Sequence, residues 1–185
     1  ISVFVVTPYR ILYKNNPLLY PFKFDNIATR NNMSFINGRD FERYHSKSIE
    51  FSGRDYRFYL RVHQALWCAS VTKNVDGDFV ELGTGRGYIF AAVCEYLRTE
   101  KINKSVYLFD TFLPYKTSKD TGEQKKGQKK SGFYAENYDV VNKKFSEFDF
   151  VILVQGKCPE ILDKIYGGNN RKISFLHVDL NFHEV

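Results

Sequence analysis

The chain has 185 residues and a formal net charge of +6, and its 43% of hydrophobic residues suffice for a folded core and exclude a disordered polymer. No apolar run approaches the roughly 18 residues of a membrane helix, and the run at 1–6 lacks the basic leader of a signal peptide, so we expect a cytoplasmic protein. Cys68, Cys94 and Cys158 lack paired spacing, which favours reduced, mostly buried thiols over a disulfide framework or a zinc knuckle.

The first part of the chain, residues 1–53, shows no clean periodicity. An apolar run at 1–6 is typical of a strand, whereas Pro17, Pro21 and the Asn-rich segment 26–37 indicate irregular structure. We predict an N-terminal cap that packs on the core. Between 54 and 73, apolar residues recur at steps of three and four, which predicts a helix.

From residue 78 onward, strand and helix patterns alternate. The strands are predicted at 78–82, 105–110, 150–154 and 173–180, and the helices at 88–98, 138–148 and 159–166. Such alternation predicts an α/β fold with a parallel sheet and right-handed crossovers. The strands are almost continuously apolar, as in a sheet that is covered on both faces. We assign residues 54–185 to this domain.

The strongest motif is Phe-Val-Glu-Leu-Gly-Thr-Gly-Arg-Gly at 79–87, a strand that runs into a glycine-rich turn. Glycines at 83, 85 and 87 let the backbone turn sharply and approach a ligand, and the helix that follows presents its N–H groups to that ligand. The acidic Glu81, two residues before the first glycine, makes a plain tight turn a weaker interpretation. A dinucleotide fingerprint would need glycine where Tyr88 stands.

The next predicted strand ends at Asp110. An acidic side chain at this place can accept hydrogen bonds from both hydroxyls of a ribose. A strand-terminal aspartate is often only a cap or a turn former, but together with the glycine turn the ribose role is favoured.

Four segments follow the order seen in class I S-adenosylmethionine-dependent methyltransferases. They are Val-Glu-Leu-Gly-Thr-Gly-Arg-Gly at 80–87, Leu-Phe-Asp-Thr-Phe at 108–112, Val-Gln-Gly at 154–156 and Leu-His-Val-Asp-Leu-Asn at 176–181. The chain most resembles the macrocin O-methyltransferase type, which methylates sugar hydroxyls of natural products, over roughly residues 60–184. The resemblance implies a Rossmann-like sheet that is truncated here after its fourth strand. An apolar edge would then be exposed, and we expect a homo-oligomer.

The resemblance also implies the residues of a cofactor site. Glu81 and the turn would hold the methionine end of S-adenosylmethionine, Asp110 with Thr111 beside it would hold the ribose, and Gln155 and Gly156 would lie beside the adenine. The turn residues of this set are Gly83, Thr84, Gly85 and Gly87.

By the same resemblance, Asp179 would bind a divalent metal and lie beside the attacking hydroxyl. Mg²⁺ prefers oxygen ligands and lowers the pKa of a bound hydroxyl. A strand-end residue that caps the next helix is an equally weighted alternative. His183 and Glu184 could complete a metal site, whereas His177 is expected to be a hydrogen-bonded structural residue. Asn181 stands where the family often has an acidic residue.

A lysine-rich segment at 116–130 carries six lysines against two acidic residues. We favour a solvated loop there, and steering of an acidic substrate is the functional alternative. Because the basic residues are not spread over a face and are not interleaved with aromatics, we expect no nucleic-acid partner.

The sequence therefore predicts an S-adenosylmethionine-dependent O-methyltransferase that acts on a small-molecule hydroxyl, with Mg²⁺ as a candidate second cofactor. Two alternatives stay open. A nicotinamide-dependent oxidoreductase would use the same strand-turn-helix unit, but the missing glycine at 88 argues against it. A non-catalytic nucleotide-binding domain that uses the lysine-rich segment would show steeply salt-dependent binding to polyanions.

Overall fold

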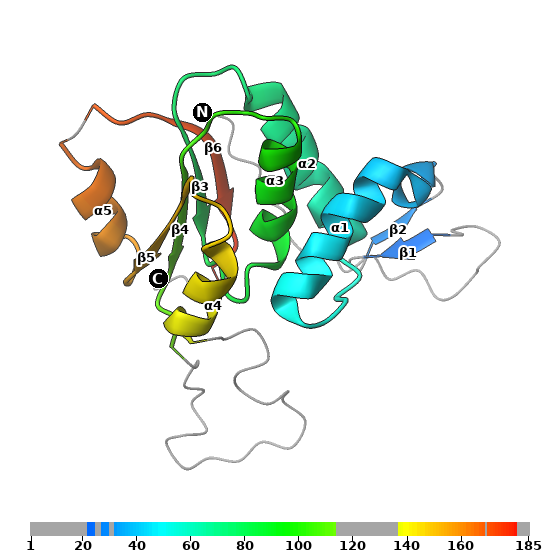
Figure 1. The fold of residues 1–185 in the computed structure, drawn as a ribbon, viewed down its shortest axis with the longest axis horizontal. Coiled ribbons are helices and arrows are strands. Elements are labelled where there is room, and N and C mark those ends of the chain that lie inside the picture. The colour runs from blue at the N-terminus through cyan, green and yellow to red at the C-terminus, as the bar shows by residue number, and fades with distance from the viewer. Residues whose placement is uncertain (1–21, 25–26, 30–31, 114–136, 169, 181–185) are drawn as a thin grey trace, which may run out of the picture.

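A computed structural model of the chain describes residues 22–24, 27–29, 32–113, 137–168 and 170–180 (Figure 1). Within these ranges no helix is long and apolar enough to cross a membrane. The strand predicted at 1–6 and the lysine-rich segment 116–130 lie outside the described residues.

A four-stranded parallel sheet forms the centre of the molecule. Its strands are β3 (Asp78–Leu82), β4 (Val106–Asp110), β5 (Val151–Gln155) and β6 (Ile173–Val178). They lie in the spatial order β5-β4-β3-β6, so that the third, second, first and fourth strands of the domain follow one another. This order, with helices in the crossovers, is that of a Rossmann-like α/β fold, as the sequence predicts.

Helices cover both faces of the sheet (Figure 1). On one face α3 (Tyr88–Thr99) packs on the strands, and α1 (Arg39–Ser52) and α2 (Tyr59–Thr72) pack in turn on α3. The short helix α4 (Tyr138–Phe145) joins the same core. The opposite face is covered by α5 (Glu160–Tyr166). A 3₁₀ turn, η1 (Ser34–Asn37), precedes α1, and a small antiparallel hairpin consists of β1 (Phe22–Phe24) and β2 (Ile27–Thr29).

The strands divide their apolar residues between two cores. On the α3 side, Phe79, Val106, Leu108 and Phe175 belong to the larger cluster, and on the α5 side Val80, Leu82, Tyr107 and Phe109 form the smaller one. Successive strand residues point to opposite faces, so a strand that is buried on both faces is apolar throughout. This is the physical reason for the continuous apolar strands in the sequence.

The N-terminal region differs from the sequence prediction. Helix α1 lies inside the range 1–53 that was predicted to be irregular, and it buries Phe41, Tyr44 and Phe51 against α3 and its neighbours. The helix predicted at 54–73 begins only at Tyr59, because the chain first passes through a turn in which Gly53 and Arg57 have positive φ angles of 70° and 58°. The later elements agree with their predicted limits to within a few residues.

Candidate functional site

The glycine turn lies at the carboxyl end of β3 and leads directly into α3. Gly83, Gly85 and Gly87 have φ angles of 91°, 53° and 84°, in the left-handed region that side chains disfavour. A Cβ atom at Gly83 would overlap the backbone carbonyl of Asp179, and one at Gly87 would lie 2.5 Å from the ring of Phe145. The turn therefore depends on glycine both for its backbone angles and for its close packing.

Backbone hydrogen bonds tie this turn to the end of β4. The Gly83 and Thr84 N–H groups donate to the carbonyl of Phe109 at 2.8 and 3.2 Å, and Gly87 N–H donates to the carbonyl of Thr84 at 2.8 Å. Gly87 is also the N-cap of α3 and has no side chain with which to cap the first turn of the helix. An uncapped helix N-terminus favours an anionic group of a ligand.

Glu81 lies on β3, just before the turn, and its side chain is fully buried. Its Oε1 is hydrogen-bonded to Nδ1 of His177 at 3.0 Å, whereas its buried Oε2 has no hydrogen-bond partner among the described residues. Burial raises the pKa of Glu81 to about 7, with Asp179 acting in the same direction and His177 and Thr84 against it. A buried carboxylate oxygen without a partner is costly, which indicates a place for a hydrogen-bond donor from a ligand.

Asp110 connects the glycine turn to the loop after β4. Its Oδ2 accepts the N–H of Gly85 at 2.7 Å, and its Oδ1 accepts the N–H of Phe112 at 2.9 Å and, more weakly, the hydroxyl of Thr111 at 3.4 Å. A carboxylate has about four lone-pair sites, so these contacts leave room for the hydroxyls of a ribose. Asp110 therefore shapes the turn as well as being a candidate ligand residue.

Gln155 and Gly156 lie at the carboxyl end of β5, next to the end of β4. The Gln155 side chain donates from Nε2 to the carbonyl of Thr111 at 3.1 Å, and the Gly156 N–H donates to the carbonyl of Asp110 at 2.9 Å. A Cβ at Gly156 would lie 2.7 Å from the side chain of Ile161, so α5 passes close to this backbone. The predicted site residues of three strands thus lie along one edge of the sheet.

Asp179 follows β6 and donates its N–H to the carbonyl of Leu82 at 2.9 Å, which places it beside the start of the glycine turn. Its half-exposed side chain lies 3.9 Å from a guanidinium nitrogen of Arg61. His177, as expected, is hydrogen-bonded within the structure, to Glu81. Asn181, His183, Glu184 and any helix that Asp179 might cap lie outside the described residues.

The residues around Asp179 do not form a magnesium site in the part of the chain that the structure describes. No group of three or more His, Cys, Asp or Glu residues there could hold a metal ion. Mg²⁺ requires near-octahedral oxygen coordination, and here one carboxylate faces an arginine instead. The donor set of the described residues therefore does not fit the Mg²⁺ that the sequence resemblance implies.

The structure also contains a buried polar cluster at the start of α3 that was not predicted from the sequence. The hydroxyl of Tyr88 lies 2.7 Å from Nε2 of His45 and donates to Oδ1 of Asp55 at 3.1 Å. Burial lowers the pKa of His45 and raises the pKa of Tyr88. The cluster thus connects His45 on α1 and Asp55 in the turn after α1 to Tyr88 at the start of α3. The position of His45 on the apolar stripe of α1 is the one sequence signal that could have revealed it.

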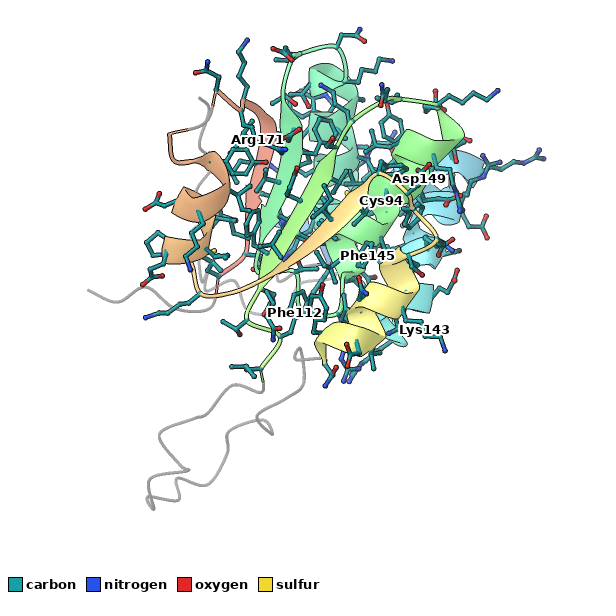
Figure 2. All side chains as sticks on the ribbon, turned by 60° about the vertical axis from the view of Figure 1, so that its left-hand side comes forward. Cys94, Phe112, Lys143, Phe145, Asp149 and Arg171 are labelled. Atoms are coloured by element: carbon teal, nitrogen blue, oxygen red, sulfur yellow. The ribbon has the colours of Figure 1, made fainter. Side chains whose placement is uncertain are left out.

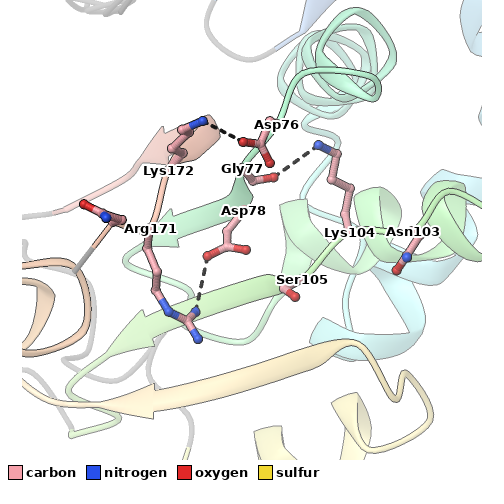
Figure 3. A pocket seen from close by; sticks show the side chains of 9 residues that line it. Asp76, Gly77, Asp78, Asn103, Lys104, Ser105, Arg171 and Lys172 are labelled. Carbon is pink, nitrogen blue, oxygen red and sulfur yellow. Dashed lines mark hydrogen bonds and ion pairs between the residues drawn. The ribbon is translucent and has the colours of Figure 1, made fainter.

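A polar recess of about 480 Å³ lies at the amino ends of the strands (Figure 3). Two of its cations are paired with carboxylates, Lys172 with Asp76 at 2.8 Å and Arg171 with Asp78 at 3.4 Å, and Lys104 donates to the carbonyl of Gly77 at 3.1 Å. Figure 2 shows Arg171 at this end of the sheet, and Phe112 and Phe145 at the other. Ligands of doubly wound sheets bind at the carboxyl ends, near the point where the strand order reverses. The glycine-turn edge is therefore the better candidate site.

These features define a Rossmann-like α/β domain with a candidate ligand site at the carboxyl edge of its sheet. The solved structure of the O-methyltransferase NovP is similar, with a TM-score of 0.42 and 22% sequence identity over 60% of this chain and 53% of that chain. The chain thus spans about half the length of NovP. No family model matches the chain. No curated protein matches it either.

Proposed function

We propose that the glycine-turn edge binds S-adenosylmethionine and that the protein transfers its methyl group to a hydroxyl of a small molecule. The observation that carries the proposal is the buried Oε2 of Glu81, which has no hydrogen-bond partner in the described structure and lies on the strand that leads into the glycine turn. The amino group of the cofactor's methionine end is a cationic donor that matches such an oxygen.

The other residues of the edge suit the rest of the cofactor. The close contacts of Gly83 and Gly87 keep the turn free of side chains, as a binding turn for a bulky ligand requires. Asp110, followed by Thr111, would accept the ribose hydroxyls, and Gln155 and Gly156 would flank the adenine. Tyr88 stands where a dinucleotide fingerprint has glycine, and its side chain is buried and hydrogen-bonded, which disfavours the nicotinamide alternative.

The chemistry follows from the cofactor. When bound, its sulfonium supplies an electrophilic methyl group for in-line attack by the acceptor hydroxyl. The protein then has to orient the two reactants and remove a proton. We assign the proton-accepting role to Asp179, whose half-exposed carboxylate follows β6 and whose backbone packs against Gly83.

The acceptor is proposed to be a hydroxyl of a sugar or another natural product. Self-association is proposed as well, because β6 is an edge strand of the described sheet and exposes Leu176 and Val178 to 42% and 56%. A concentration-dependent mass in analytical ultracentrifugation that reverts to the monomer in Val178→Lys would support self-association. A monomer at every concentration would contradict it.

Calorimetric titration tests the cofactor proposal. S-adenosylmethionine and S-adenosylhomocysteine should bind saturably, and NAD should not. Glu81→Gln should weaken binding about tenfold or more, since a charge-assisted hydrogen bond contributes about 1.5–3 kcal/mol. Glu160→Gln, the same change at an exposed residue of α5, should leave affinity unchanged. A chain that binds neither sulfur compound, or that binds NAD more tightly, would refute the proposal.

A further inference from the structure

A positive charge from the protein itself lies beside Asp179. Arg61, from the first turn of α2, brings a guanidinium nitrogen to 3.9 Å from Oδ2 of Asp179. The same guanidinium lies over the ring of Phe58, 4.4 Å from its centroid. A cation over an aromatic ring is attracted to the ring face, so the stacking holds Arg61 near the carboxyl end of β6.

The neighbouring ionisable groups are paired among themselves. Glu81 and His177 share a hydrogen bond of 3.0 Å beneath Asp179, and the ring of His177 lies 6.0 Å from that of Phe90, which packs against it. The described ionisable groups around the end of β6 are thus two carboxylates, one histidine and one arginine: Glu81, Asp179, His177 and Arg61. No group of three or more His, Cys, Asp or Glu side chains that could hold a dication forms there.

We propose that Arg61 supplies the positive charge beside Asp179 and that this end of the site works without a bound divalent cation. The inference deepens the proposed function and rests on it in treating Asp179 as the proton acceptor. Arginine is charged at every working pH, so this positive charge is permanent. The positive charge of Arg61 repels an approaching dication.

Binding of Mn²⁺ to the whole chain, followed by electron paramagnetic resonance in the absence of cofactor, tests the inference. The wild-type chain should show no saturable binding below about 1 mM, since one exposed carboxylate is a weak ligand set. Arg61→Glu replaces the repelling cation with a second carboxylate and should tighten Mn²⁺ binding at least tenfold. Adding Asp179→Asn to that variant should abolish the gain.

Arg43→Glu on α1 is the matched control, because it makes the same change of charge at an exposed arginine away from the site. It should leave Mn²⁺ binding unchanged. Circular dichroism of each variant checks that it is folded, and Arg61→Gln offers a milder change that should also leave the chain without a tight site.

Two results would overturn the inference. One is saturable, submillimolar binding of Mn²⁺ to the wild-type chain that Asp179→Asn removes. The other is an Arg61→Glu variant that binds Mn²⁺ no better than Arg43→Glu does. Because no cofactor is present, these results are independent of the cofactor titration, so a failure of the proposed function can be told from a failure of this inference.

Discussion

The packing of Gly83 against the end of β6 allows a quantitative test with a matched control. Gly83 has a φ of 91°, and a Cβ there would overlap the carbonyl of Asp179. Gly53, at the C-cap of α1, has a similar φ of 70°, but a Cβ there would meet nothing within 4 Å. Alanine at either position is strained by the left-handed backbone conformation. Alanine at Gly83 must also displace the backbone at the end of β6.

The two terms can be estimated separately. A residue with a Cβ in the left-handed region costs about 1–2 kcal/mol relative to glycine. Forcing extra volume into a packed contact costs about 1–3 kcal/mol more. The free energy of unfolding should therefore fall by about 1–2 kcal/mol in Gly53→Ala and by about 2–5 kcal/mol in Gly83→Ala.

Urea denaturation followed by circular dichroism measures both changes. The midpoint should shift while the slope stays the same, because neither substitution alters the surface exposed on unfolding. If Gly83→Ala costs no more than Gly53→Ala, the glycine turn does not pack on the end of β6 as described. The placement of Asp179 beside the turn would then be wrong.

Three further substitutions test individual contacts. Tyr88→Phe removes the hydroxyl that bonds to His45 and should cost about 1–3 kcal/mol in urea denaturation, so a loss below about 0.5 kcal/mol would contradict a buried cluster. Burial raises the pKa of Glu81 from its ordinary 4.5 to about 7. The contribution of Glu81 to the free energy of unfolding is therefore complete below pH 4.5 and is lost as the pH rises through 7. Glu81→Gln should therefore flatten the decline of stability with rising pH, and an unchanged slope would disprove the shift. Asp110→Ala leaves the Gly85 N–H without its acceptor and should lower the free energy of unfolding by about 1–3 kcal/mol even without cofactor, whereas a purely ligand-binding Asp110 would leave it unchanged.

Much of the fold is predictable because its signals are local. The strand at Asp78–Leu82 and the glycine turn after it are readable from a short apolar run and from three glycines. The parallel sheet follows from alternation of strands and helices, which permits few topologies. The strand ends at Asp110 and Gln155 then meet at one edge, since all strands point the same way.

The remaining features depend on tertiary contacts that no local pattern records. Helix α1 is amphipathic, but its buried residues are aromatic and polar rather than aliphatic, so no aliphatic stripe marks it in the sequence. Tyr88 meets a histidine that lies 43 residues earlier in the chain. Arg61 was part of a predicted helix, yet only the folded structure places it beside Asp179. The contacts of such polar residues depend on which distant residues the fold brings beside them, so they cannot be predicted from the local sequence.

A cofactor site at the glycine turn can be tested directly by titrating the ¹⁵N-labelled chain with S-adenosylhomocysteine and following the amides by NMR. The amides of Gly83, Gly85 and Gly87 at the carboxyl edge of the sheet should shift saturably. The amides of Gly77 and Ser105, which line the recess at the opposite edge, should stay in place. Shifts confined to the opposite edge, or no shifts at all, would contradict a cofactor site at the glycine turn.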